Sequence, residues 1–473
     1  MSELLRESDP ASQQVSSPSP SPESKTYNEQ NDSESGAAEK KTPVKETNTE
    51  AVQEEEPFFD FQMFINDLKN PKAEPLVKYT RSFLSNFVTQ KKFWTAEEQE
   101  KLVRNFKVFI YGKFSEFEPF NTLDRAKLNN AQEGLEKLIM GKLYPFCFSP
   151  ELASKIDIEE LDESHKNDVL NDQFLEDKIA EYSFIELDNL DVPNKISTKL
   201  SRFLRLAGKE LNKINHFKAP RDKMVCILNS CKVIFGILRH FKLDKDGADS
   251  FIPLLIYVII HGNVTKLVSN VKYIERFRYE KFLKSEDQYY LSSLQAATNF
   301  IINMNRKDLT IKDEIEFDAQ YTVNQETQKK LREEKELKQK QEQEASAHPL
   351  TESPYNPIDD ITSSMVSMFS DFFTNAASTP AVAETDGSTA VPTPTPTSKA
   401  ATPKRRRSSH NRAKDDLFMQ TAVKKMEEDE QAETVESLVE MFPDLPPELI
   451  EDICIAKKYR TGVCVDTLLN LYE

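Results

Sequence analysis

The chain has 473 residues, a formal net charge of −17 and a hydrophobic fraction of 38%. This charge argues against general nucleic-acid binding, because neutralising phosphates requires a basic face. Five cysteines are an odd number spread over three candidate domains, and no N-terminal apolar stretch resembles a signal peptide. We therefore expect reduced thiols and a cytoplasmic location. The longest apolar run, residues 251–260, is about half a bilayer span and predicts a buried helix.

Two tracts lack the apolar residues that a core needs. Residues 1–54 are rich in Ser, Pro, Glu, Asn and Thr, and predict a disordered tail. Residues 309–432 predict a charged linker rich in Ser, Thr and Pro, within which Lys329–Glu344 is either a solvated helix or disordered. The linker also contains a basic run, Lys404–Arg407, and an apolar island at 361–373. The basic run fits a solvated charge run, a nuclear-import signal or an anionic-lipid contact, and the island fits a docking segment.

Between these tracts, residues 55–175 predict a helical bundle. Apolar residues recur at steps of three and four from Phe58 to Leu68, which is typical of an amphipathic helix. Similar patterns predict further helices at 74–89, 95–113 and 126–143. The acidic stretch at 150–175 predicts a loop or a solvated helix on the edge of the bundle.

Residues 176–308 predict a second helical domain with a denser core. Helical spacing of apolar residues predicts helices at 199–217, 220–241, 251–260 and 289–304. Apolar residues almost surround the axis of the helix at 220–241, which predicts a central position. Glycines and prolines are scattered rather than clustered, so the fold class we predict is all-α.

No motif supports covalent chemistry. The sequence contains no Gly-rich phosphate loop, HExxH, CxxC or G-x-S-x-G, and its six histidines are scattered. We therefore expect neither an enzyme with covalent chemistry nor a metal or cofactor. Two other segments require an explanation, namely G-A-D-S-F-I-P at 247–253 and E-D-Q-Y-Y-L-S-S at 286–293.

These two segments, with the apolar residues that follow each, resemble the most specific parts of the domain named after vacuolar protein sorting protein nine. Exchange factors for Rab5-type GTPases contain this domain. The resemblance covers the bundle from about residue 57 and the second domain from about 176 to 305. It implies a guanine nucleotide exchange factor that acts in endosomal and vacuolar protein transport, with a Rab5-type GTPase as partner and peripheral recruitment to endosomal membranes.

Asp249 has two interpretations. An aspartate ahead of an apolar helix with a first-turn proline is a natural N-cap. The resemblance implies instead that Asp249 is the acidic finger, the residue that exchange domains of this family insert into the nucleotide site of the GTPase. On that interpretation Asp249 is the catalytic residue.

The resemblance also implies three residues that contact the GTPase. Pro253 matches a position near the finger, although it fits a first-turn proline equally well. Tyr290 matches a tyrosine that contacts the switch region, and its alternative is a core aromatic. Adjacent helical residues diverge, so Tyr289 and Tyr290 cannot both enter one core, and we expect Tyr290 to face outward. Ser293 matches a position where the family commonly has threonine.

The last segment, residues 433–473, predicts a small three-helix domain with proline breaks. It resembles the CUE family of ubiquitin-binding domains, with Met441-Phe442-Pro443 ending the first helix and Leu468-Leu469 in the third. The resemblance implies that these five residues form an exposed apolar patch for ubiquitin. The alternative is that they form the small core. CUE domains also pair, so a dimer through this domain is a further expectation.

Two alternatives to the exchange factor remain from the residues alone. The first is a ubiquitin-binding adaptor whose helical domain binds the GTPase without releasing nucleotide. The second is a helical scaffold with neither activity, for which changing Asp249 would cost only a helix cap of about 1 kcal/mol.

Overall fold

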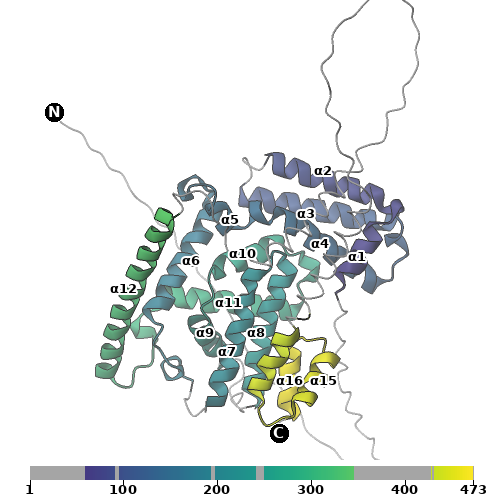
Figure 1. The fold of residues 1–473 in the computed structure, drawn as a ribbon. Helices are drawn as coiled ribbons and strands as arrows, with labels where there is room; N and C mark the ends of the chain where they lie inside the picture. Colours follow the sequence, from purple (N-terminus) through teal and green to yellow (C-terminus); the bar gives the residue numbers. More distant parts are fainter. Residues whose placement is uncertain are drawn as a thin grey trace, which may run out of the picture. The chain divides into compact units, whose positions relative to one another are not determined.

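The computed structural model describes residues 59–90, 95–192, 198–240, 250–345, 428 and 431–471. Every regular element in these ranges is an α-helix or a short 3-10 helix, which confirms the predicted all-α fold class (Figure 1). None of the helices in these ranges has the length and apolar content needed to cross a bilayer. The predicted tail at 1–54, the basic run Lys404–Arg407 and the island at 361–373 lie outside the described residues.

Four helices form the N-terminal bundle, as the sequence predicts. They are α1 (Phe61–Leu68), α2 (Glu74–Gln90), α3 (Ala96–Lys113) and α4 (Arg125–Cys147). Side-chain caps fix where three of them begin. Asp60 and Asp124 accept hydrogen bonds from the backbone amides of Met63 and Lys127, and Thr95 forms a capping box with Glu98 at the start of α3.

Aromatic side chains fill the core of the bundle. Phe83 stacks on Phe106 with ring centroids 4.0 Å apart, and Phe114 stacks on Phe120 at 4.6 Å. The same cluster of buried side chains includes residues from a later helix, α10 (Leu267–Phe277). The bundle and the following helices therefore share apolar core.

The acidic stretch at 150–175 differs from its prediction. It contains α5 (Ser149–Ala153) and most of α6 (Glu163–Glu181), and α6 is packed rather than solvated. Asp168 is buried because it pairs with Arg276 of α10 and accepts a hydrogen bond of 2.7 Å from Ser149 Oγ. The predicted domain boundary after residue 175 falls inside α6, whose Leu175 belongs to the core of the second domain.

The second domain is built around one central helix, as predicted. Its helices are α7 (Thr198–Asn212), α8 (Pro220–His240), α9 (Phe251–His261), α10 and α11 (Ser285–Asn303). The apolar run at 251–260 forms α9, a buried core helix in which Leu254, Leu255 and Ile259 are fully buried. Helices α7 and α9 approach closely through two glycines, since a Cβ on Gly208 would lie 3.1 Å from Gly262 Cα.

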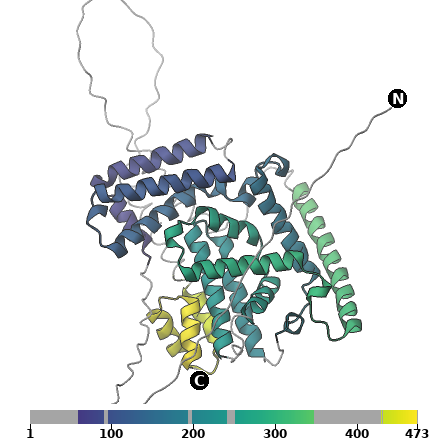
Figure 2. The same ribbon diagram turned by 180° about the vertical axis from the view of Figure 1, so that it is seen from behind.

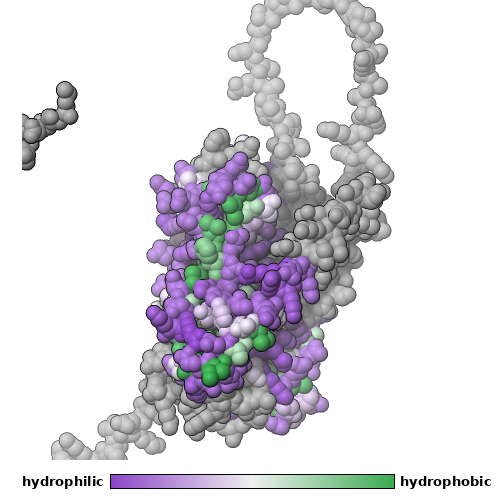
Figure 3. Space-filling view, turned by 90° about the vertical axis from the view of Figure 1, so that its left-hand side faces the viewer, coloured by the Kyte–Doolittle hydropathy of each residue, from purple (hydrophilic) through white to green (hydrophobic). Residues whose placement is uncertain are grey.

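The predicted start of the linker at residue 309 is too early. Helix α12 (Glu314–Ala345) follows, and its first half packs on the fold (Figures 1 and 2). Phe317 is 6% exposed, and Asn324 Nδ2 donates to the carbonyl oxygens of Ala180 and Glu181 at 2.9 Å each. The face of the molecule on the α12 side is mostly hydrophilic, with a narrow apolar strip (Figure 3). The segment from 309 to about 330 therefore belongs to the folded part.

The C-terminal segment forms three helices, as predicted. The first covers residues 431–441, and α15 (Pro447–Ala456) and α16 (Thr461–Leu471) follow. Pro446 and Pro447 set the start of α15, since proline suits the first turn of a helix. In Figures 1 and 2 these helices lie against α7 and α8, and their buried side chains join the core of the second domain.

Candidate exchange and ubiquitin sites

The first candidate site lies where α9 begins. Asp249 lies outside the described residues, directly before the residue at which the structure resumes. The N-cap position of α9 belongs to Ser250, which makes no side-chain cap hydrogen bond. Pro253 is the third residue of α9 and half-buried, which agrees with a first-turn proline.

An aromatic cluster supports the start of α9. Phe251, the first residue of the helix, is fully buried and stacks on Phe235 of α8 with ring centroids 4.4 Å apart. Tyr289 and Tyr290 of α11 lie 6.0 and 6.2 Å from the same ring. Such aromatic contacts contribute about 0.5–1.5 kcal/mol each beyond area burial. The first turn of α9 therefore lies on an aromatic base formed by side chains of α8 and α11.

The expected orientation of Tyr290 was wrong. Tyr290 is 7% exposed, whereas Tyr289 is 41% exposed and faces outward. One tyrosine of the pair does leave the core, as the divergence of adjacent helical residues requires. Which one leaves depends on the packing of Phe235 and Phe251, which the sequence alone does not give.

Polar contacts hold the buried tyrosine in place. Tyr290 Oη donates a hydrogen bond of 3.1 Å to Glu286 Oε1, and Lys232 Nζ of α8 lies 3.9 Å from the same carboxylate oxygen. Burial, followed by the nearby Glu286, raises the pKa of Tyr290, so its hydroxyl remains a donor at neutral pH. Ser293 is 6% exposed and lies one turn further along α11. In this structure, therefore, both predicted contact residues of α11 are buried.

Three of the buried cysteines among the described residues are protonated thiols. Burial raises the pKa of Cys147, Cys226 and Cys231, so these thiols stay protonated. Within the described part of the chain, no cluster of His, Cys, Asp or Glu side chains could hold a metal ion.

The second candidate site is the predicted ubiquitin patch. Its proline, Pro443, is exposed, but the four other side chains are not: Met441 is 8%, Phe442 1%, Leu468 0% and Leu469 3% exposed. The expectation of an exposed patch is therefore wrong for this arrangement of the chain. Leu468 belongs to the core, as the alternative interpretation held.

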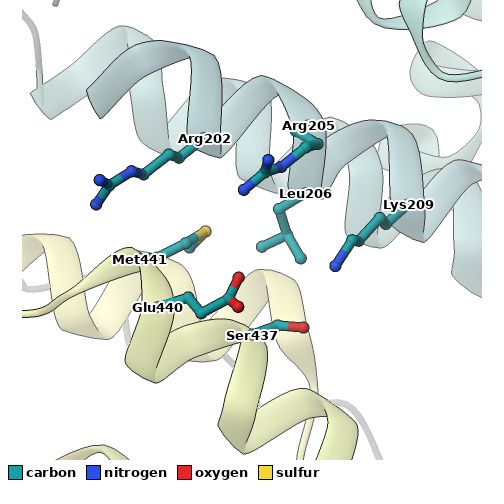
Figure 4. Close-up of a pocket in the computed structure, with 7 residues that line it drawn as sticks. All are labelled: Arg202, Arg205, Leu206, Lys209, Ser437, Glu440 and Met441. Carbon is teal, nitrogen blue, oxygen red and sulfur yellow. The ribbon is translucent and has the colours of Figure 1, made fainter. Parts of the chain in front are cut away.

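Helices of the second domain cover the other patch residues. The ring of Phe442 meets that of Phe203 on α7 edge-on, with centroids 5.5 Å apart. Leu469 reaches α8 so closely that a Cβ on Gly236 would lie 2.9 Å from its Cδ1. Met441 lines a small cleft with Arg202 and other residues of α7 (Figure 4). The two halves of the predicted motif thus face α7 and α8.

Comparison with protein families matches the segments around both candidate sites to known domains. Residues 204–306 match the vacuolar sorting protein 9 (VPS9) domain, and residues 432–471 match the CUE domain. The chain is a VPS9-domain protein with a C-terminal CUE domain. The VPS9 match contains the start of α9 and all of α11, and the CUE match contains every residue of the predicted ubiquitin patch. Residues 78–144 of the bundle match a domain of unknown function, DUF5601.

Curated relatives agree with the VPS9 assignment. The chain is 43% identical over 283 residues to vacuolar protein sorting-associated protein vps901 of Schizosaccharomyces pombe, covering 59% of this chain and 48% of that protein. It is 35% identical to vacuolar protein sorting-associated protein 9A of Oryza sativa, over 54% of this chain and 50% of the relative. It is 28% identical to the Rab5 GDP/GTP exchange factor of Mus musculus, over 53% and 48%. The matches thus span about half the length of each relative.

Proposed function

We propose that this VPS9-domain protein is a guanine nucleotide exchange factor for a Rab5-type GTPase, with Asp249 as its acidic finger. It releases GDP without making or breaking a covalent bond. The VPS9 match and the similarity to a relative named as a Rab5 GDP/GTP exchange factor support this activity. Relatives named for vacuolar protein sorting support a role in endosomal and vacuolar transport, with recruitment to the cytoplasmic face of endosomes.

One observation carries the proposal, namely the position of Asp249 immediately before a helix that starts on the aromatic base. Phe251 lies two residues further on, and its full burial against α8 and α11 restrains the end of the segment. A restrained carboxylate loses less conformational entropy on binding than one in the middle of a free loop. We infer that this restraint lets Asp249 enter a nucleotide site.

The mechanism follows from how a GTPase holds its nucleotide. Mg²⁺ and a phosphate-binding lysine hold the β-phosphate. A carboxylate placed in that site repels the phosphate and pairs with the lysine. The pairing also stabilises the emptied site, because the lysine would otherwise be a buried unpaired charge. We infer that Pro253, Tyr290 and Ser293 contribute to the GTPase-binding surface beside the finger. Tyr290 and Ser293 are buried, so they act by shaping the surface unless GTPase binding moves them.

The test is release of a fluorescent GDP analogue from a Rab5-type GTPase in the presence of the full chain. Asp249→Asn keeps the size of the side chain and removes its charge, so we expect it to lose most of the acceleration. Asp246→Asn is the matched control, because it removes the same charge three residues earlier in the same segment. Thermal unfolding of each variant checks that the fold is retained.

Two results would overturn the assignment of Asp249. Equal losses in the two variants would mean that only the net charge of the segment matters. Full activity of Asp249→Asn would mean that the finger lies elsewhere. A chain that binds the GTPase without accelerating release would instead support the alternative, a ubiquitin-binding adaptor.

We further propose that the CUE domain binds monoubiquitin through Met441, Phe442, Pro443 and Leu469, while Leu468 belongs to the core. The CUE match supports this role. Ubiquitin on endosomal cargo would then raise the local concentration of the exchange domain near its membrane-bound GTPase. Binding of labelled monoubiquitin to the full chain, compared with Met441→Asp, tests the assignment, and unchanged binding of the variant would contradict it.

A further inference from the structure

The CUE domain packs on the VPS9 domain through α16 and α8, and each of these helices has a glycine in the contact. A Cβ on Gly462 of α16 would lie 2.8 Å from Lys232 Cβ and 3.3 Å from the carbonyl oxygen of Asn229, both on α8. A Cβ on Gly236, one turn further along α8, would meet only Leu469 and Val465 of α16. Glycines on both partners let the two helix backbones approach closely, so this is a tightly fitted contact.

Charges complement each other around this contact. Arg202, Arg205 and Lys209 form an exposed basic row on α7, and Glu440 of the first CUE helix faces this row across the cleft (Figure 4). At the other end, Arg239 of α8 pairs with Asp466 of α16. Such exposed pairs contribute little affinity, but they fix the orientation in which two surfaces meet.

The apolar centre of the contact is the predicted ubiquitin patch. Met441, Phe442 and Leu469 supply it, and each is less than a tenth exposed. An apolar side chain buried against one surface has no area left for a second. Ubiquitin cannot reach these three side chains while they contact α7 and α8.

We propose that the face formed by α7 and α8 is a docking site for the CUE domain that competes with ubiquitin for the same patch. The inference rests on the ubiquitin binding proposed above. Docked chains cannot bind ubiquitin, and ubiquitin-bound chains leave α7 and α8 uncovered. The apparent ubiquitin affinity of the full chain is then its intrinsic affinity multiplied by the undocked fraction.

The first test locks the docked state with a disulfide. Lys232→Cys with Gly462→Cys places two Cβ atoms about 2.8 Å apart, and a small outward shift brings them to the separation of about 3.5–4.5 Å that a disulfide needs. The five native cysteines are buried and compete little for the bond. When about nine in ten chains or more are oxidised, we expect the sample to bind at least about tenfold less labelled monoubiquitin than the reduced chain, because a locked chain has no undocked state. Oxidised wild type is the control.

The second test opens the contact without changing the CUE domain. Gly236→Leu adds a side chain that meets only Leu469 and Val465, and it replaces glycine by a stronger helix former in α8. We expect ubiquitin binding about tenfold tighter than in wild type if about a tenth of chains are undocked. Gly112→Leu in α3 is the matched control, because no atom lies within 4 Å of a Cβ at that position.

The outcomes separate this inference from the function on which it rests. If the locked chain and Gly236→Leu both bind ubiquitin as wild type does, docking does not compete and the inference is wrong, while ubiquitin binding stands. If no form binds ubiquitin, Gly236→Leu included, the proposed ubiquitin binding fails and the competition fails with it. Failure of the disulfide to form would also contradict the docking, because the two Cβ atoms would then not meet.

Discussion

Replacing Glu136 by alanine should destabilise the protein by about 3–5 kcal/mol, because it leaves buried Lys107 without a carboxylate partner and takes one of two carboxylate partners from Arg278. Glu136 Oε2 lies 2.9 Å from Lys107 Nζ, and Oε1 lies 2.8 Å from Arg278 Nη1. Oε2 also accepts a hydrogen bond of 2.7 Å from the backbone amide of Tyr279. These contacts join α3 and α4 of the bundle to the end of α10. Urea unfolding followed by circular dichroism measures the loss.

Glu133→Ala is the matched control for this prediction. Glu133 lies on the same helix and also accepts from Arg278, at 3.1 Å, but its side chain is 21% exposed. Water can replace an exposed partner, so we expect a loss of about 1 kcal/mol. Equal losses in the two variants would show that burial of the Glu136 network adds nothing to stability.

The carboxylate of Glu136 also makes the free energy of unfolding depend on pH in the acid range. Burial alone would raise the pKa of Glu136, but Lys107 and Arg278 outweigh it, so the pKa lies below its ordinary value. At a pH above the ordinary pKa of glutamate, Glu136 is charged in both the folded and the unfolded chain, and its stabilisation of the fold is fully present. The stabilisation is lost as the pH falls through the folded-state pKa, since the unfolded chain binds the proton first.

Apolar periodicity predicted most of the helices because their cores are aliphatic and aromatic. It failed at α6, where buried acids made a packed helix look solvated. Asp168 is neutralised by Arg276, which lies 108 residues away, and no local pattern records such a partner. The start of α12 was missed for a similar reason, because its contacts are made by isolated residues such as Phe317 and Asn324.

The position of each candidate site along the chain could be predicted from the sequence, but the exposure of its side chains could not. The segments around Asp249 and Met441 could be located from the resemblance, whereas the exposure of Tyr290 and of the ubiquitin patch depends on α7 and α8. The sequence did contain one signal of the contact between α8 and α16, namely two glycines. Gly236 and Gly462 each lie within a helix and have no turn to make, and an isolated glycine inside a helical pattern often has a packing role.

Another buried cation, Lys223, lies where the bundle meets the VPS9 domain. Lys223 of α8 is fully buried, and its ammonium lies 4.9 Å from the ring centroid of Phe148 and 5.2 Å from that of Tyr144. It donates hydrogen bonds to the carbonyl oxygen of Ile214 at 2.9 Å and to Asn270 Oδ1 at 2.5 Å. No carboxylate of the described chain forms an ion pair with it. Burial therefore lowers the pKa of Lys223 to about 7.

The free energy of unfolding of the wild type should rise between pH 7 and pH 9, and comparison with a variant that lacks Lys223 should show that this lysine causes the rise. The ordinary pKa of lysine is 10.5, so between about 7 and 10.5 the unfolded chain binds more protons than the folded one, and stability increases with pH. Relative to Lys223→Met, the wild-type free energy of unfolding should increase by about 2 kcal/mol from pH 7 to pH 9, measured by urea unfolding at each pH. Lys113→Met is the control, because the hydrogen bond from exposed Lys113 to Glu116 raises the pKa of Lys113, and its titration lies above this range. A difference between wild type and Lys223→Met that stays constant from pH 7 to pH 9 would mean that Lys223 remains charged inside the fold, held there by its aromatic neighbours and two oxygen acceptors.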